Sequence, residues 1–148
     1  MIFTKDKITV KLYDSRKEMG EIAASDTAAK IEELLLVKDE INIIFAAAPS
    51  QNEFLASLVK ENRIDWSRIN AFHMDEYIGL EEDAPQRFGH FLKESIFGKV
   101  PFKQVNYING KALPSEECAR YEALLKQYPA DIVCLGIGEN GHIAFNDP

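Results

Sequence analysis

Apolar residues recur along the chain in two alternating patterns, one typical of strands and the other typical of helices. Short apolar stretches favour strands, and unbroken ones favour strands buried on both faces. We expect strands at residues 8–12, 41–46, 69–74, 105–108 and 132–135. Between them, apolar residues spaced three and four apart favour helices with one packed face. We expect these helices at residues 15–35, 50–59, 88–96 and 114–125.

Capping signals indicate where two of the helices begin. Ser15 precedes Glu18, and Ser50 precedes Glu53, by the three-residue spacing of a capping box. Pro49 suits the first turn of the second of these helices. The first helix is expected to pack through one apolar face, formed by Met19, Ile22, Ala23, Ile31, Leu34 and Leu35.

Strands that alternate with helices predict a parallel, doubly wound sheet with helices on both faces, an α/β/α sandwich. In such sheets ligands bind beyond the carboxyl ends of the strands. Residues 46–51, 75–77 and 139–147 all follow predicted strands. The economical interpretation is one site built from three loops.

Length and composition restrict the class of protein. A chain of 148 residues predicts one domain, 1–148, with a substantial core. The net charge of −7 argues against nucleic acid or an anionic membrane surface as a partner. Cys118 and Cys134 are expected to be buried thiols and not a disulfide. No stretch resembles a leader or a membrane span, so we expect a cytoplasmic protein.

Two adjacent carboxylates, Asp75 and Glu76, come directly after a predicted buried strand. Partial desolvation and a neighbouring like charge both raise the pKa of a carboxyl group. A raised pKa suits a general base that works near neutral pH. Asp75 could equally cap the turn that follows, which is a common role of aspartate. The local sequence leaves both interpretations open.

The last predicted strand runs into a turn rich in glycine and in acid/base side chains. Three glycines permit sharp turns or a close approach of the backbone to a ligand. The glycines are Gly136, Gly138 and Gly141, and the polar residues among them are Glu139, Asn140, His142, Asn146 and Asp147. This composition favours an active-site edge, and the alternative is an ordinary turn whose polar residues face water.

The loop after the strand at 41–46 has the geometry of a phosphate site. Backbone N–H groups at the start of the next helix would point at an anion bound there. The residues that would bind it are Ala47, Ala48 and Ser50. Many α/β proteins have a similar turn with nothing bound, so an empty loop remains the alternative.

Two longer stretches resemble a known family. Residues 72–80, FHMDEYIGL, and residues 136–148, GIGENGHIAFNDP, are similar to the two signature stretches of the glucosamine-6-phosphate deaminase (isomerase) family. The sister 6-phosphogluconolactonases share the Gly-His core of the second stretch. The resemblance runs from near residue 8 to the end of the chain. It implies a Rossmann-like fold, no metal and no organic cofactor.

The resemblance also implies a reaction on a small-molecule sugar phosphate. An amino-sugar phosphate ring opens, the aldose isomerises to a ketose, and ammonia leaves, which converts glucosamine 6-phosphate to fructose 6-phosphate. Asp75 matches the carboxylate that moves the proton between C2 and C1. His142 matches the histidine that assists ring opening, and Asp147, where many members have Glu, would set the state of that histidine.

Further positions match residues that bind substrate or shape the site. Glu76 and Tyr77 complete the first signature stretch, and Gly141 lies in the Gly-His core of the second. Ala47 and Ala48, with Pro49, match a loop that is usually Gly-Thr-Pro.

Three features depart from the family pattern. Asn140 stands where the deaminases usually have Asp, and it can accept a hydrogen bond from the imidazole but cannot stabilise imidazolium by charge. Glu139 or Asp147 would then take that task, or the chain would catalyse a different reaction. The alanine loop lacks the glycine freedom and the threonine hydroxyl of the family loop. Family members also continue for roughly another hundred residues, about one further half-domain.

Two classes of function therefore compete. The first is an aldose–ketose isomerase or deaminase, supported by the stretches that carry Asp75 and His142. The second is a non-catalytic remnant or sugar-phosphate sensor, supported by Asn140 and the alanine loop. A 6-phosphogluconolactonase-type hydrolase is a third, weaker alternative. Taken alone, the 148 residues are expected to bind sugar phosphate weakly, to lack activity and to form homo-oligomers.

Overall fold

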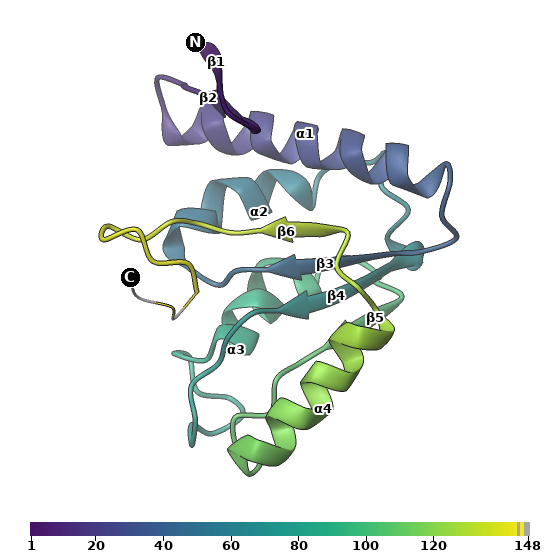
Figure 1. The fold of residues 1–148 in the computed structure, drawn as a ribbon, viewed down its shortest axis with the longest axis vertical. Helices are drawn as coiled ribbons and strands as arrows, with labels where there is room; N and C mark the ends of the chain where they lie inside the picture. Colours follow the sequence, from purple (N-terminus) through teal and green to yellow (C-terminus); the bar gives the residue numbers. More distant parts are fainter. Residues whose placement is uncertain (145, 147–148) are drawn as a thin grey trace.

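The computed structural model describes residues 1–144 and Asn146, and its centre is a four-stranded parallel sheet (Figure 1). The strand order is β5–β4–β3–β6, and each neighbouring pair is parallel. The strands are β3 (Ile41–Phe45), β4 (Ile69–His73), β5 (Gln104–Asn106) and β6 (Ile132–Cys134). The predicted class, a doubly wound parallel sheet, is confirmed.

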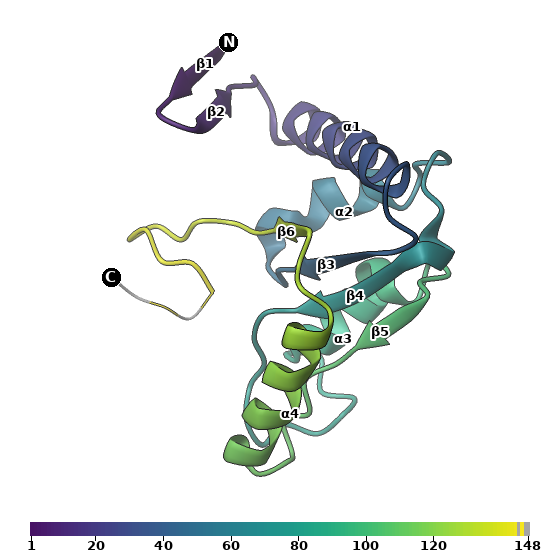
Figure 2. The ribbon, with the colours of Figure 1, turned by 45° about the vertical axis from the view of Figure 1, so that its right-hand side comes forward.

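Helices cover both faces of this sheet. They are α1 (Arg16–Leu35), α2 (Asn52–Leu58), α3 (Phe88–Leu92) and α4 (Pro114–Gln127). Short 3₁₀ turns at Pro49–Gln51 and Trp66–Arg68 precede α2 and β4, and a π-helical turn, Lys93–Phe97, extends α3. Figures 1 and 2 show α1 and α2 on one side of the sheet and α4 on the other. Within the described residues, no helix is long and apolar enough to cross a membrane.

The main core lies between the sheet and the helices α1, α2 and α3. Every second strand residue faces it, because side chains of a strand alternate between faces. These residues are Ile41, Ile43 and Phe45 of β3 and Ile69 and Ala71 of β4, all with no exposed surface. Each large apolar side chain buried in this way stabilises the fold by about 1.5–3 kcal/mol. Phe72 points to the opposite face, where its ring meets Tyr121 of α4 edge-on.

The face through which α1 packs differs from the predicted one. Met19 and Ile22 are 44% and 37% exposed, so assigning them to the core was wrong. Ile31 is buried as predicted, and Leu34 and Leu35 pack against the core, but the other buried positions are Gly20, Ala24 and Ala28. A side chain at Gly20 would lie 2.7 Å from the backbone of Glu53 in α2, so the two helices approach too closely for large residues.

One of the two predicted capping boxes forms in part, because the Glu18 carboxylate accepts from the Asp14 backbone N–H at 3.3 Å, where a full box would use Ser15. Ser15 Oγ accepts a hydrogen bond from the backbone N–H of Glu18 at 3.1 Å, which caps α1 as predicted. The Ser50–Glu53 box was wrong, because the turn that leads into α2 has Ala48 at its cap and no side-chain capping bond. Glu53 instead accepts two hydrogen bonds from the Arg16 guanidinium.

The predicted burial holds for one cysteine and fails for the other. Cys134 is buried in β6, and Cys118 is exposed on α4. The buried positions of α4 are Glu117 and Tyr121, so Cys118 lies at the rim of its contact with the sheet. Both thiols are free, as predicted.

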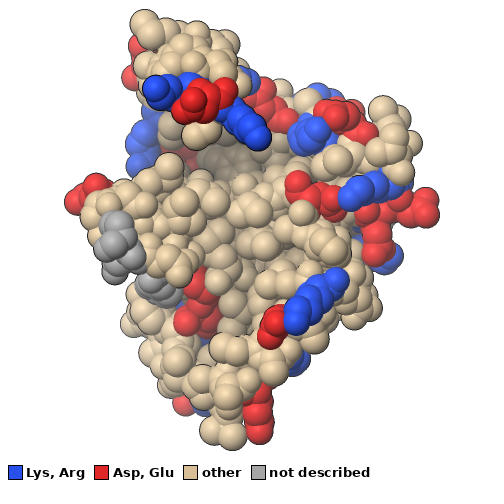
Figure 3. All heavy atoms as spheres, viewed as in Figure 1, with Lys and Arg blue, Asp and Glu red and all other residues tan. Residues whose placement is uncertain are grey.

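Strand β6 is less buried than its apolar sequence predicts. Val133 is 47% exposed and Leu135 beyond it is 38% exposed. The reason is topological, since β6 lies at the edge of the sheet and, in the part of the chain that the structure describes, pairs with β3 alone. Figure 3, drawn in the same view as Figure 1, shows a broad uncharged surface over this part of the sheet.

Polar side chains fix the register at the amino ends of the strands. Asn42 and Asn70 are register partners, and the Asn70 amide donates to Asn42 Oδ1 at 2.9 Å. Asp131, just before β6, accepts a hydrogen bond from the Asn42 backbone N–H at 2.9 Å. A slip of one residue would leave these buried polar groups without partners, which costs about 1–3 kcal/mol for each group.

An antiparallel hairpin precedes the sheet and lies apart from it in Figure 2. It pairs β1 (Ile2–Lys5) with β2 (Ile8–Lys11). The strand expected at residues 8–12 therefore exists, but β1 was not predicted. Asp6 adopts a positive φ of 53° in the turn between them, a conformation that Asp tolerates better than most residues.

The close contact of α1 with α2 predicts that Gly20→Val lowers the free energy of unfolding by about 2–3 kcal/mol, because the new side chain would overlap the Glu53 backbone. Ala29→Val, at an exposed position of the same helix, is the matched control and should cost only its lower helix propensity, about 0.5 kcal/mol. Urea unfolding of both variants measures the difference. Equal losses would show that the helices can separate freely at Gly20.

Candidate active site

Three strands of the sheet end in one row. Phe45, the last residue of β3, is the register partner of His73 in β4 and of Cys134 in β6. Each of these residues is also the last of its strand. The loops that follow therefore leave the sheet at the same level, and they enclose a cavity of about 200 Å³. Among its lining residues are Ala47, Ala48, Ser50, Asp75, Gly138 and His142.

Asp75 reaches this cavity from the loop after β4. Its side chain is partly buried, and burial raises the pKa of its carboxyl group above the usual value of 3.8. The neighbouring Glu76 carboxylate raises that pKa further. Both causes agree with the sequence prediction, and both favour a carboxylate that accepts a proton readily.

Glu76 is directed away from Asp75, toward the start of α3. Its carboxylate has no exposed surface and accepts hydrogen bonds from the backbone N–H groups of Phe88 and Gly89, each at 2.9 Å. The Arg87 guanidinium pairs with it at 3.3 Å. Glu76 therefore holds the Asp75 segment against α3. Tyr77 is 44% exposed, and its ring packs on that of Phe88, which lines the cavity.

His142 is held in a tight turn of the glycine-rich loop. Its Nδ1 lies 2.6 Å from Asn140 Oδ1, which also accepts the His142 backbone N–H at 3.2 Å. Because an amide oxygen only accepts, Nδ1 carries the proton when the ring is neutral. Nε2 is then the nitrogen able to take up a further proton.

Two glycines make this turn possible for different reasons. A Cβ on Gly138 would lie 2.1–2.4 Å from atoms of the His142 ring, so the ring occupies the space of the missing side chain. Gly141 has φ +88°, the left-handed region that favours glycine. Asp147, which the sequence places beside this turn, lies outside the described residues.

The alanine loop contributes the third wall of the cavity. Ala46–Ala48 and Ser50 line it, and Ser50 Oγ accepts a hydrogen bond from the Gln51 amide at 3.3 Å. Sequence reasoning missed a cation that contacts this loop. Arg16 donates to the carbonyl oxygen of Pro49 at 3.0 Å while it pairs with Glu53. A separation of 33 residues hides that contact from any local pattern.

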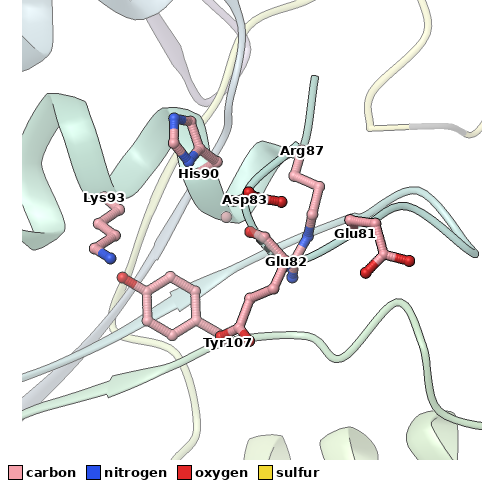
Figure 4. Close-up of a pocket in the computed structure, with 8 residues that line it drawn as sticks. Glu81, Glu82, Asp83, Arg87, His90, Lys93 and Tyr107 are labelled. Atoms are coloured by element: carbon pink, nitrogen blue, oxygen red, sulfur yellow. Dashed lines mark hydrogen bonds between the residues drawn. The ribbon is translucent and has the colours of Figure 1, made fainter. Parts of the chain in front are cut away.

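A larger hollow, of about 590 Å³, lies beside α3 and has a different character. Figure 4 shows its charged and polar lining, which includes Glu82, Arg87, His90, Lys93 and Tyr107. Acidic and basic side chains both line it, and neither Asp75 nor His142 is among the residues that line it. The smaller cavity is therefore the candidate active site. No group of three His, Cys, Asp or Glu within the described residues is arranged to hold a metal ion.

Comparison with protein families gives one match over most of the chain. The profile described as "Glucosamine-6-phosphate isomerases/6-phosphogluconolactonase" matches residues 14–145. A glucosamine-6-phosphate deaminase of Listeria innocua is 37% identical over 130 residues, which cover 87% of this chain and 56% of the relative. A glucosamine-6-phosphate deaminase of Exiguobacterium is 40% identical over 119 residues, which cover 76% of this chain and 47% of the relative. The chain thus spans about half the length of these relatives.

Solved structures show the same fold. A monomeric glucosamine-6-phosphate deaminase superposes with a TM-score of 0.80 at 29% identity, covering 92% of this chain and 58% of the other. A 6-phosphogluconolactonase from Thermotoga maritima superposes with a TM-score of 0.79 at 25% identity, covering 90% of this chain and 61% of the other. Together with the parallel sheet, these likenesses confirm the expected Rossmann-like architecture.

The raised pKa of Asp75 predicts a stability that depends on pH. A carboxyl group whose pKa is raised in the folded state stabilises the fold below its unfolded pKa, and that contribution is lost as pH rises through the folded pKa. Asp75→Asn removes the titration. The variant should therefore gain stability relative to the wild type between pH 3 and pH 7, as measured by urea midpoints across that range. Asp83→Asn, at an exposed position of the neighbouring loop, is the control. If the difference in urea midpoint between Asp75→Asn and the wild type stays constant with pH, the desolvation of Asp75 is contradicted.

The two glycines predict opposite effects of an added methyl group. Gly138→Ala should displace the His142 ring with little loss of stability, because the ring can move more easily than the backbone. Gly141→Ala should leave the ring in place and strain the backbone by about 1–2 kcal/mol. NMR of the His142 ring, with thermal unfolding of both variants, separates the two effects. Unmoved ring resonances in Gly138→Ala would contradict the packing of His142 on Gly138.

Proposed function

The chain belongs to the family of glucosamine-6-phosphate isomerases and 6-phosphogluconolactonases, and from that premise we propose that it carries the proton-transfer groups of a glucosamine-6-phosphate deaminase. The substrate would be an amino-sugar phosphate and the products a ketose phosphate and ammonia. Residues 1–148 would act as one α/β domain of that enzyme. The observation that supports this most strongly is that Asp75 and His142 line one cavity at a common edge of the sheet.

Asp75 is the proposed base of the isomerisation. It would take the proton from C2 of the ring-opened sugar and return it to C1, which leaves an imine at C2 for water to hydrolyse to the ketose and ammonia. Its raised pKa supports this role, because a carboxylate with a pKa closer to neutral pH is a stronger base for the C2 proton. Glu76 supports this role of Asp75 indirectly. Its carboxylate already accepts hydrogen bonds from backbone N–H groups of α3, so Asp75 is the carboxylate left for the substrate.

His142 is the proposed acid/base for ring opening. Asn140 fixes the proton of the neutral ring on Nδ1, so Nε2 would exchange a proton with the ring oxygen of the sugar. Asn140 supplies orientation without a negative charge. In this proposal Asp147 supplies the charge that stabilises imidazolium.

The alanine loop is the proposed site of the sugar phosphate. Ala47, Ala48 and Ser50 line the same cavity as Asp75, and the Ser50 hydroxyl and backbone N–H groups of the loop would bind the phosphate. A phosphate held there would leave the sugar carbons within the span of the cavity. Gly141 would contribute by permitting the turn that brings His142 to the opposite wall.

We expect that Asp75→Asn, in the protein at its full natural length, lowers the exchange of the substrate C2 hydrogen with solvent by about 10²–10⁴-fold, because the amide cannot accept the proton. NMR of glucosamine 6-phosphate in deuterated water measures the exchange. Asp83→Asn is the matched control. Exchange at the wild-type rate in Asp75→Asn would exclude the proposed role of Asp75.

The same preparation distinguishes the alternative functions. Ammonia and ketose phosphate formed together indicate a deaminase, and 6-phosphogluconate formed from its lactone indicates a lactonase. The solved lactonase of similar fold is the reason to include that assay. Binding of the sugar phosphate with no turnover of either substrate would favour a sensor.

A further inference from the structure

His73 uses both of its ring nitrogens to bind backbone on two different segments. It is the last residue of β4 and is 1% exposed. Its Nε2 accepts a hydrogen bond from the backbone N–H of Ile108 at 2.9 Å. Its Nδ1 lies 3.0 Å from the carbonyl oxygen of Asp75. Because the carbonyl oxygen only accepts, Nδ1 must carry the proton, and this agrees with Nε2 acting as an acceptor.

The surroundings keep this ring neutral. Burial lowers the pKa of His73 below its usual value of 6.5, and this effect outweighs the nearby Glu76 carboxylate, which raises it. Arg87, which pairs with Glu76, lowers the pKa further. Among the described residues, the titratable rings of Tyr107 and Tyr121 also face this ring, edge-on at 6.0 and 6.4 Å. Both backbone bonds of His73 therefore persist at neutral pH.

The Asp75 segment has two attachments that act from opposite sides. His73 holds the carbonyl oxygen of Asp75 itself, and Glu76 holds the following residues against α3. Between these points the Asp75 side chain lines the cavity. Together they fix the peptide group that follows the Asp75 Cα, and this restricts the directions open to the Asp75 side chain.

We propose that His73 is a positioning residue for Asp75, which acts by donating a hydrogen bond from Nδ1 to the Asp75 carbonyl and thereby directs the carboxylate into the cavity. The inference rests on the proposed function, in which Asp75 is the base. His73 acts through the backbone of Asp75 and takes no part in proton transfer. Misplacing a catalytic group by about 1 Å can cost about 10²-fold in rate.

Two substitutions separate this role from a general role in holding the strands together. The amide nitrogen of asparagine is as many bonds from Cβ as Nδ1 of histidine, so His73→Asn retains the donor to Asp75 and loses the bond to Ile108. The amide of glutamine extends as far as Nε2, so His73→Gln can accept from Ile108 and loses the donor at the Nδ1 position. A positioning role predicts that Asn substitutes well and Gln poorly. A purely structural role predicts the reverse.

The test measures C2 hydrogen exchange and thermal unfolding of both variants in the protein at its full natural length. We expect His73→Asn to retain most of the exchange rate and His73→Gln to lose about 10²-fold. His90→Gln, which makes the same change on α3 at the larger hollow, is the matched control and should leave the rate unchanged (Figure 4). Exchange in His73→Gln that equals or exceeds exchange in His73→Asn would overturn the proposal.

A second measurement needs no variant. Imidazole ¹⁵N NMR of the wild-type protein at neutral pH should show His73 as the neutral ring protonated at Nδ1, and protonation at Nε2 would overturn the proposal even if both variants fail to fold. The outcomes also separate this inference from the proposed function. If Asp75→Asn retains exchange, the proposed function fails, whatever the tautomer of His73. If Asp75→Asn loses exchange and His73→Gln does not, only the positioning role fails.

Discussion

The hydrogen-bonded ladder between β3, β4 and β6 is the constraint on which the candidate site depends. Its register places the last residues of all three strands in one row, with Phe45 between His73 and Cys134. Asp75 and the loop that carries His142 are separated by more than sixty residues of sequence. The loops that carry both residues nevertheless leave the sheet at that row. The side-chain amides of Asn42 and Asn70 hold the same register from the other end of the strands. These buried amides add to the register set by packing, because a slip would leave them without hydrogen-bond partners.

The sequence was sufficient to predict the strands and helices of the parallel sheet and the loops that meet at the candidate site, but not β1. Apolar periodicity reports which segments are strands and helices, and the rule for parallel sheets reports where their loops gather. Prediction from the sequence failed where the burial of a residue depends on partners distant in the chain. Met19 and Ile22 have the spacing of a core face, but the approach of α1 to α2 selects Gly20 and the alanines instead. Val133 has the composition of a buried strand and lies on an edge.

The candidate site shows the same division between local and distant information. The strand end with its carboxylates, and the glycine turn around His142, are local features that the sequence displays. The partner of Glu76 is Arg87, and the partners of His73 include Ile108, and no local pattern indicates either contact. A fully buried Glu–Arg pair gains little net stability, because desolvation offsets the attraction. Its hydrogen bonds to α3 instead make one conformation of the Asp75 segment more favourable than its alternatives.

The strand order also has a consequence for the order in which the chain acquires its structure. β3 pairs on one side with β4, which follows it closely, and on the other with β6, whose anchor Asp131 is 89 residues from Asn42. Loop closure over that span is entropically costly, so β3 and β4 are expected to associate first. During synthesis, one edge of β3 stays open until residues 132–134 have left the ribosome. The cavity, whose third wall follows β6, would be the last part of the sheet edge to form.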